Sequence, residues 1–244
     1  MERERNHPFK EIFARNIVGI DIDGVVALSV VPVLAQVNSD LGTNYQIMDF
    51  TGWHSVKDWA LPVYIERGMP ESVALRAASE YDTRVWTHPD LLGAAPVHRG
   101  AEAFIKRLHN EGIEYYFITS RIPELFDSTI RWFRRNLPWV DPSVIRVNTN
   151  PELEGKDFKW QTVAKLGIGV HIDDYFEHAK LIVDRTFASA VLLSNLGGLG
   201  FRHPRFYRLT AEGRLPDLKD LHKRLLFNNP FSVAQSIDNI PPLG

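Results

Sequence analysis

The chain has 244 residues, of which 44% are hydrophobic and 24% charged, so it can bury the core of one large domain or of a domain with a smaller insertion. Its formal net charge of −2 argues against a protein that coats nucleic acid or a membrane surface, while a locally basic site for a small anion stays compatible with it. Cysteine is absent, which excludes disulfides, cysteine nucleophiles and cysteine metal sites.

The N-terminal stretch MERERNHPFKEIFARN mixes both charge signs and lacks the apolar segment of a secretory signal. No apolar run reaches the roughly 18–20 residues that span a bilayer. We therefore expect a soluble, cytoplasmic protein.

The first strand candidate is the apolar run NIVGI (16–20), which leads directly into DIDG (21–24). Strand alternation points the side chains of Asp21 and Asp23 to the same side, with Ile22 opposite. Ligands of open α/β sheets bind at the carboxyl ends of strands, and two crowded carboxylates are tolerated best when they share a cation or a proton. The pair therefore indicates an Mg²⁺ site beside a bound phosphate. A structural Asp–Gly turn is the competing interpretation, and the pair alone does not decide between them.

Residues 27–95 contain no βαβ unit and hold helical patches such as 30–42 and 71–82. We interpret this interval as a mainly helical cap inserted after the first strand, so that residues 1–26 and 96–244 form the core and residues 27–95 the cap. The aromatic residues of the cap can stack on a nucleobase or form the cap's own small core, and we favour the second role for most of them. They are Tyr45, Phe50, Trp53, Trp59, Tyr64 and Trp86.

Strand and helix patterns alternate from residue 100 onward, which indicates βαβ units and a parallel sheet covered by helices on both faces. We therefore predict an α/β fold with a Rossmann-like core. The remaining segment, 195–244, holds a loop NLGGLG and a helix near 217–226, and we assign it no function. The strand candidates are 115–118, 144–148 (the weakest), 169–172 and 189–193, and the helix candidates are 100–112, 122–137, 157–167 and 174–185.

Polar residues follow two further strand candidates. The strand YYFI ends at Thr119 and Ser120, whose hydroxyls and amides suit a phosphate at a helix N-terminus, although a plain N-cap is the alternative. The strand GVHI ends at Asp173 and Asp174, which offer more carboxylate for a metal, although an acidic first helical turn is the alternative.

A lysine at a helix start lies between these two motifs. The stretch EGKDFKWQ contains Lys156 and Lys159, either of which can neutralise the charge of a phosphate. A solvated surface lysine is the default interpretation for any single lysine.

The order strand–DxDG, strand–TSR, lysine, strand–DD resembles the four motifs of the haloacid dehalogenase (HAD) superfamily of phosphotransferases over residues 17–24 and 96–194. The interval after the first motif looks like the first-position cap of that superfamily. More narrowly, VGIDIDGVVA, PVHRGAEAFIKRLHNEGIEYYFITSR and KWQTVAKLGIGVHIDD look like the 5′(3′)-deoxyribonucleotidase family and its bacterial relatives.

The resemblance implies a role for each motif. Asp21 is the nucleophile that forms an aspartyl-phosphate, and Asp23 protonates the leaving oxygen and later activates water. Thr119 binds a phosphoryl oxygen, and the amides around Gly24 and at Ser120 add donors.

The resemblance also implies an Mg²⁺ ion, bound in part by the main-chain carbonyl of Asp23. We favour Asp173 as a direct ligand, with Asp174 either in contact with the ion or one layer further out. Alignment with the nucleotidase relatives selects Lys159 as the motif lysine that assists catalysis and phosphate binding, and Lys156 stays open. The implied metal ligands are Asp21, Asp23, Asp173 and Asp174.

The function that we expect from the resemblance is an Mg²⁺-dependent phosphomonoesterase acting on (deoxy)nucleoside monophosphates. The alternatives are a phosphatase of a sugar phosphate or other small metabolite, a 3′-phosphatase of nucleic-acid ends, and an inactive relative that binds phosphate or a protein partner. The mild net charge argues against the second alternative, and the filled motif positions argue against the third. We expect a small phosphorylated substrate and neither a membrane nor polymeric nucleic acid as partner, and a homodimer stays open.

Overall fold

The computed structural model describes residues 16–150, 152–193 and 200–209, and these residues contain one parallel sheet of six strands in the order β3-β2-β1-β4-β5-β6. The predicted helix near 217–226 and most of the NLGGLG loop lie outside the described residues. The strands are β1 (Ile17–Ile20), β2 (Tyr115–Thr119), β3 (Ile145–Val147), β4 (Ile168–Asp173), β5 (Ser189–Leu193) and β6 (Phe206–Leu209).

The first strand, β1, lies in the interior of the sheet between β2 and β4, and both pairings are parallel. The chain adds β2 and β3 on one side of β1 and then adds β4, β5 and β6 on the other. The strand order therefore reverses between β1 and β4, and open α/β sheets bind their ligands in the crevice at such a point.

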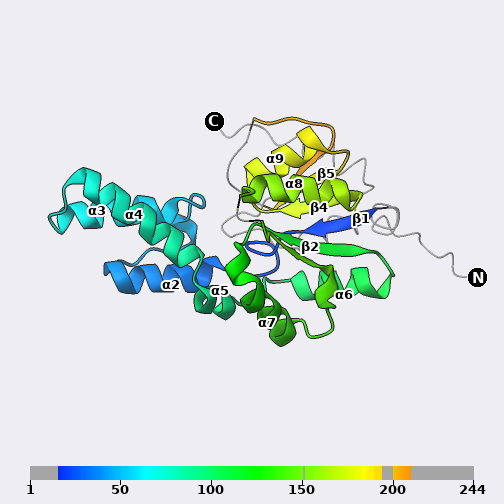
Figure 1. Cartoon of the computed structure of the whole chain (residues 1–244), viewed down its shortest axis with the longest axis horizontal. Coiled ribbons are helices and arrows are strands. Elements are labelled where there is room, and N and C mark those ends of the chain that lie inside the picture. The colour runs from blue at the N-terminus through cyan, green and yellow to red at the C-terminus, as the bar shows by residue number, and fades with distance from the viewer. Residues whose placement is uncertain (1–15, 151, 194–199, 210–244) are drawn as a thin grey trace, which may run out of the picture.

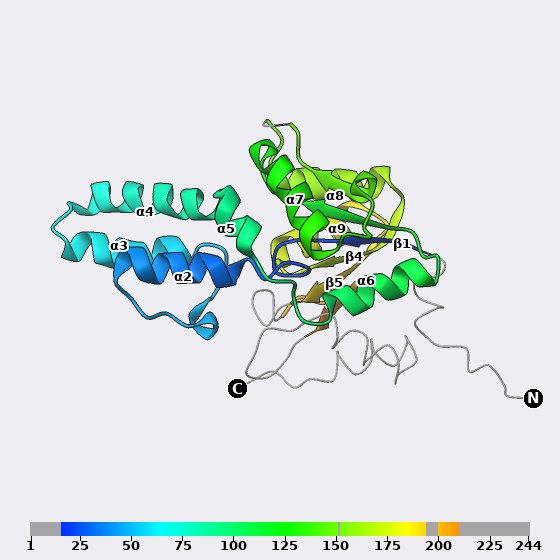
Figure 2. The same ribbon diagram turned by 90° about the horizontal axis from the view of Figure 1, so that it is seen from below.

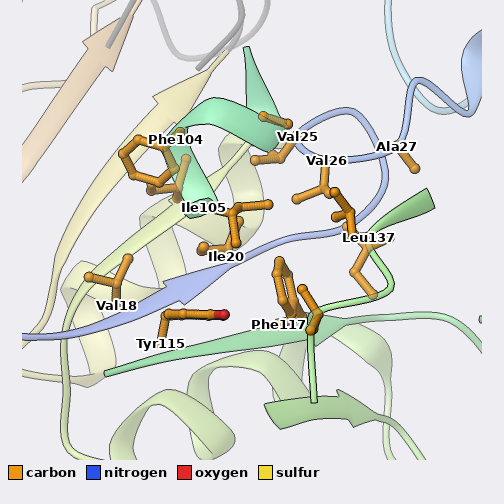
Figure 3. Packing of buried hydrophobic residues seen from close by; sticks show 14 of the residues in the cluster. Val18, Ile20, Val25, Val26, Ala27, Phe104, Ile105, Tyr115, Phe117 and Leu137 are labelled. Atoms are coloured by element: carbon orange, nitrogen blue, oxygen red, sulfur yellow. The ribbon is translucent and has the colours of Figure 1, made fainter. Parts of the chain in front are cut away.

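Helices cover both faces of this sheet, as Figure 1 shows. The pairs α6 (Ala101–Asn110) with α7 (Phe126–Asn136) and α8 (Gly155–Lys165) with α9 (Phe176–Arg185) lie on opposite sides. Successive side chains of a strand point to opposite faces of the sheet. Phe117 therefore packs in the core under the first pair of helices, and its neighbour Ile118 packs in the core under the second. Figure 3 shows the first of these cores, in which Ile20 and Phe117 pack among side chains of α6 and the segment after α7.

The α/β class and the five predicted strands are confirmed, each strand within one residue at either end. The edge strand β6 was not predicted, because its sequence FYRL is short and carries a charged residue. The helix predicted over 122–137 is interrupted, since Pro123–Leu125 form a 3₁₀ turn before α7 begins at Phe126. The acidic-first-turn interpretation of Asp174 is wrong, because α9 begins only at Phe176.

Helices occupy the interval 27–95 between β1 and α6, and Figures 1 and 2 both show them as a group to one side of the sheet. They have a hydrophobic core of their own, to which Val37, Val56 and Val85 contribute from three different helices. No helix in the described part of the chain is long and apolar enough to cross a membrane. The helices of this interval are α2 (Val30–Leu41), the 3₁₀ turn η1 (Ile47–Asp49), α3 (Ser55–Glu66), α4 (Glu71–Trp86) and α5 (Pro89–Ala94).

Helix α3 was not predicted, because Pro62 lies within it and proline removes a helical hydrogen bond. The segments that enter and leave this group of helices run side by side. The amide of Leu28 donates to the carbonyl of Pro96, and the amide of His98 donates to that of Val26. These two hydrogen bonds lie at the boundary that we proposed between core and cap. The division into core and cap itself stays a prediction.

The core under α6 and α7 generates a stability prediction. Phe117 is fully buried, and Phe117→Ala should lower the free energy of unfolding by about 3–5 kcal/mol, because it removes apolar burial and leaves a cavity. Phe187 is fully exposed, so Phe187→Ala should leave the urea midpoint nearly unchanged. Equal midpoint shifts for the two variants would contradict this description of the core.

Candidate active site

The carboxyl ends of β1, β2 and β4 bring three sequence-predicted residues to one edge of the sheet. Asp21 directly follows β1, whereas Thr119 and Asp173 are the last residues of β2 and β4. The main-chain amide of Asp21 donates to the carbonyl of Ile172 at 2.9 Å, which extends the β1–β4 pairing to the tip of the strand. The predicted motifs on these strands therefore meet at the point where the strand order reverses.

Lys159 extends from α8 into this edge and pairs with two carboxylates. Its Nζ lies 2.9 Å from Asp21 Oδ2 and 2.7 Å from Asp173 Oδ2, and the residue is 1% exposed. Burial alone would lower the pKa of Lys159, but the charges of Asp173 and Asp21 raise it above its usual value, so the ammonium stays charged. Lys156, which the sequence left open, has a half-exposed side chain and pairs instead with Glu154.

Three carboxylates gather beside this lysine. Oxygens of Asp21, Asp173 and Asp174 lie within 4.8 Å of one another. Burial raises the pKa of Asp21 to about 8, with Lys159 opposing the shift and Asp173 adding to it. Burial, followed by the charges of Asp21 and Asp173, holds the pKa of Asp174 well above its usual value. Such a group is stable when it shares a cation or a proton, and its hard oxygen donors fit Mg²⁺.

The contacts distinguish the two adjacent aspartates at the end of β4. Asp173 Oδ2 is bound by Lys159 and by His171 Nε2 at 3.2 Å, and its Oδ1 accepts from the amide of Tyr175 at 2.9 Å. Burial would raise the pKa of Asp173, but Lys159, the nearby histidines and their hydrogen bonds hold it well below its usual range. Asp174 Oδ1 is buried without a hydrogen-bond partner. Asp174 therefore has an oxygen free for a ligand, whereas both oxygens of Asp173, which the sequence had led us to favour, already have partners. The choice of direct metal ligand between them stays a prediction.

Two histidines near Asp173 were not predicted as site residues. His171 lies on β4 two residues before Asp173, so strand alternation puts both on one face, and this spacing is the signal that was available in the sequence. His178 Nδ1 lies 3.6 Å from Asp173 Oδ1. Gly19 leaves room for His171, because a Cβ there would lie 2.5 Å from its Nδ1.

Asp23 is held by Arg121, a partner that lies 98 positions away in the chain. The guanidinium donates from Nε to Oδ2 at 2.8 Å and from a terminal nitrogen to Oδ1 at 2.7 Å, and the other terminal nitrogen donates to Thr129 Oγ1 at 3.0 Å. The hydroxyl of Ser29 donates a further hydrogen bond to Asp23. Burial would raise the pKa of Asp23, but Arg121 and the hydrogen bonds outweigh burial and lower it.

The two hydroxyl residues after β2 lie beside the carboxylates. Thr119 Oγ1 accepts from the amide of Arg121 at 3.2 Å, and Ser120 Oγ is buried without a hydrogen-bond partner, so it can donate to a ligand. The N-cap interpretation is wrong for both residues, because Ile122 and Leu125 occupy the N-cap positions of the turn and helix that follow.

Two glycines allow close approaches at this edge. Gly155, the first residue of α8, lies so near Ser120 that a Cβ there would be 2.6 Å from the serine Cβ. The helix N-terminus beside Ser120 is therefore that of α8. Gly24 has φ +78°, and a Cβ there would lie 2.0 Å from Asp174 Oδ2, so only glycine fits between the DIDG turn and that carboxylate.

A cavity of about 340 Å³ opens above these residues, and core and cap both line it. Its wall on the core side includes six of the predicted site residues, and its wall on the cap side comes from α4, α5 and the segment before α3. The predicted site residues at the cavity are Asp21, Asp23, Thr119, Ser120, Lys159 and Asp174, and the cap residues are Trp53, His54, Asp82, Trp86 and Leu92.

The cap aromatics divide between core and cavity. Tyr45 stacks on Trp59 with ring centroids 4.4 Å apart, and both pack with Tyr64 against the hydrophobic core of the cap. Trp53 and Trp86 line the cavity, with ring centroids 4.5 Å apart, and Trp86 also packs against the cap core. Sequence periodicity could not separate these roles, because the division depends on how α3 and α4 face the sheet edge.

No model of a known protein family matches the chain, and no curated protein matches it. Solved structures do match. A HAD hydrolase of family IA, variant 3, from Entamoeba histolytica shares 15% identity over 80% of this chain and 92% of that chain, with a TM-score of 0.51. The haloacid dehalogenase-like family protein SP0104 from Streptococcus pneumoniae shares 11% identity over 79% of this chain and 93% of that chain, also with a TM-score of 0.51.

The chain therefore has the fold of the haloacid dehalogenase-like hydrolases. The predicted likeness to the superfamily is confirmed at the level of the fold. The narrower likeness to deoxyribonucleotidases stays a prediction.

The buried lysine generates a second stability prediction. Lys159→Met should lower the free energy of unfolding by about 3–5 kcal/mol, because it leaves the buried charge of Asp173 without its partner and removes the contact to Asp21. Lys156→Met removes an exposed lysine from the same helix and should shift the urea midpoint little. Similar shifts for both variants would show that the ion pairs of Lys159 do not stabilise the fold.

The carboxylate cluster predicts opposite effects with and without metal. A carboxyl group whose pKa is higher in the folded than in the unfolded state destabilises the folded state at any pH above the unfolded value of roughly 4. Without metal, Asp174→Asn should therefore raise the free energy of unfolding at pH 7 by about 1 kcal/mol. Mg²⁺ should raise the melting temperature of the wild type, because it binds only the folded state, and should raise that of the variant much less. Thermal unfolding with EDTA and with Mg²⁺ measures both effects, and an equal Mg²⁺ shift in both proteins would exclude Asp174 as a ligand.

Proposed function

We propose that the protein is an Mg²⁺-dependent phosphomonoesterase that forms an aspartyl-phosphate on Asp21 and acts on (deoxy)nucleoside monophosphates. One observation carries the proposal: Asp21 and Asp23 line one cavity together with Lys159 and two hydroxyl residues. Phosphate monoesters resist attack because they are anionic, so a catalyst needs cations and hydrogen-bond donors around a fixed nucleophile. The cavity holds both kinds of group.

The phosphate would lie above Asp21, where Ser120 Oγ and the amides of Ile22 and Asp23 would be the donors on this chain. The amide of Gly24, which the sequence had suggested as a further donor, instead donates to the carbonyl of Ala27 at 2.8 Å. Lys159, fixed between Asp21 and Asp173, orients the nucleophilic carboxylate and supplies positive charge. Mg²⁺, when bound by Asp21, Asp174 and the main-chain carbonyl of Asp23, would neutralise charge on the phosphate.

Two steps with balanced proton transfers complete the reaction. In the first, an Asp21 oxygen bonds to phosphorus, the ester bond to the leaving oxygen breaks, and Asp23 gives that oxygen a proton. In the second, Asp23 takes a proton from water, and the water oxygen bonds to phosphorus and displaces Asp21 with its carboxylate restored. Arg121 favours the charged form of Asp23, which is the form that the second step needs. The first step needs its protonated form, which the approaching negative charge of the phosphate favours.

The residues on the cap side of the cavity favour a nucleotide over a small aliphatic phosphate as the substrate. Trp53 and Trp86 present indole rings to the cavity, and stacking of a base on an aromatic side chain contributes about 1–3 kcal/mol. A volume of about 340 Å³ lies at the lower end of the range for small-molecule sites.

The test is phosphate release from deoxy- and ribonucleoside 5′- and 3′-monophosphates, sugar phosphates and p-nitrophenyl phosphate, with Mg²⁺ and with EDTA. Asp21→Asn should lower kcat by about a thousandfold or more, because the amide is a poor nucleophile. Asp90→Asn, an exposed change on α5, is the matched control and should retain activity.

The possible outcomes distinguish a nucleotidase, a sugar phosphatase and a protein without phosphatase activity. Mg²⁺-dependent release that is fastest with nucleotides would support the whole proposal. Fastest release from a sugar phosphate would retain the chemistry and reject the nucleotidase. No release from any compound by a folded, Mg²⁺-bound protein would reject the phosphatase.

A further inference from the structure

The cap side of the cavity differs in charge from the core side. The lysine and the arginine among the described lining residues, Lys159 and Arg121, lie on the core side, and both are already paired with carboxylates. The cap contributes Asp82 as its charged acidic group, beside His54 and the two indole rings. The described wall that faces the leaving group therefore carries a carboxylate and no lysine or arginine.

Two polar atoms of this wall lack partners. Asp82 and Trp86 lie one helical turn apart on α4, and both Asp82 Oδ1 and Trp86 Nε1 are buried without a hydrogen-bond partner. Burial raises the pKa of Asp82, while the charge of His54, the main-chain amide of Lys57 and the charge of Lys57 oppose that shift. The indole N–H of Trp86 lies near enough to favour the charged carboxylate but does not reach hydrogen-bonding geometry with it.

A ligand can satisfy these atoms only with particular chemistry. A buried carboxylate oxygen needs a donor, and an amino group on a flat ring can reach it while the ring packs on the indoles. A second phosphate or a carboxylate on the leaving group would be repelled by Asp82, and the described cap residues that line the cavity offer it no lysine or arginine.

We propose that Asp82 determines the specificity of the site by accepting a hydrogen bond from an amino group on a flat leaving group and by excluding a second anion. This inference rests on the proposed phosphatase function. The substrate class that it names is a nucleoside monophosphate whose base carries an exocyclic amino group, and the classes that it rejects are bisphosphates and phosphorylated carboxylic acids.

Deoxycytidine and deoxyuridine monophosphates form a matched pair for the test. They differ in an amino group on one ring and a carbonyl oxygen in the same position on the other, so Asp82 should accept from the first and repel the second. The wild type should favour deoxycytidine monophosphate about tenfold or more in kcat/KM, because a site built to accept a hydrogen bond rejects an analogue that lacks the donor.

The experiment compares this ratio in the wild type, Asp82→Asn and Glu80→Gln. Asparagine keeps the shape of the side chain, but its amide can turn to donate or accept, so the ratio should fall about tenfold toward one and phosphoglycolate should become a relatively better substrate. Glu80 is exposed on the same helix and does not line the cavity, so Glu80→Gln should keep the wild-type ratio. An unchanged ratio in Asp82→Asn, or no preference in the wild type, would overturn the role of Asp82.

A binding measurement distinguishes failure of the specificity role of Asp82 from failure of the proposed phosphatase function. If the wild type releases no phosphate from any compound, the phosphatase is rejected, and calorimetry with the same two nucleotides and Mg²⁺ still tests Asp82. Tighter binding of deoxycytidine monophosphate by the wild type, lost in Asp82→Asn, would support the specificity role. Equal affinities, or no binding of either nucleotide, would overturn it.

Discussion

The buried ammonium of Lys159 is the interaction on which this site depends. It compensates two carboxylates, Asp21 and Asp173, that come from adjacent strands and would repel each other in a low-dielectric edge of the sheet. Its helix, α8, begins at Gly155 against Ser120, so one helix fixes both the lysine and the neighbouring hydroxyl residue. A third carboxyl, Asp174, stays outside these pairs, and burial beside two other aspartates raises its pKa. A divalent cation that replaced its proton would stabilise the group, so the edge fits such an ion.

The sheet and the cap supply different parts of the chemistry. Reversal of the strand order beside β1 brings together groups that lie as far apart in the sequence as Asp21 and Asp174, and rigid strand ends hold them in place. The inserted helices carry no group of the reaction that we propose. They close the cavity with two indole rings and the carboxylate of Asp82, so the choice of leaving group is assigned to a part of the chain that can vary independently of the catalytic edge.

Sequence patterns predicted what local rules determine. The strands NIVGI and GVHI and the aspartates at their ends follow from short apolar runs and two-residue alternation, so the α/β class and most site positions could be predicted. The pairing of Arg121 with Asp23 could not, because it joins residues 98 apart through a turn whose shape has no local signature. Helix α3 was obscured by Pro62, and the roles of Trp53 and Asp82 depend on how the cap helices face the core. The choice between Lys156 and Lys159 likewise needed the direction of α8.

The most direct test of the account is to look for the covalent intermediate. The wild-type protein would be mixed with Mg²⁺ and its best nucleoside monophosphate, quenched in acid within a single turnover, and digested for peptide mass spectrometry. The account predicts the added mass of one phosphoryl group on the peptide that contains Asp21, and none in Asp21→Asn. Phosphate release without that adduct, or the adduct on another residue, would contradict Asp21 as the nucleophile.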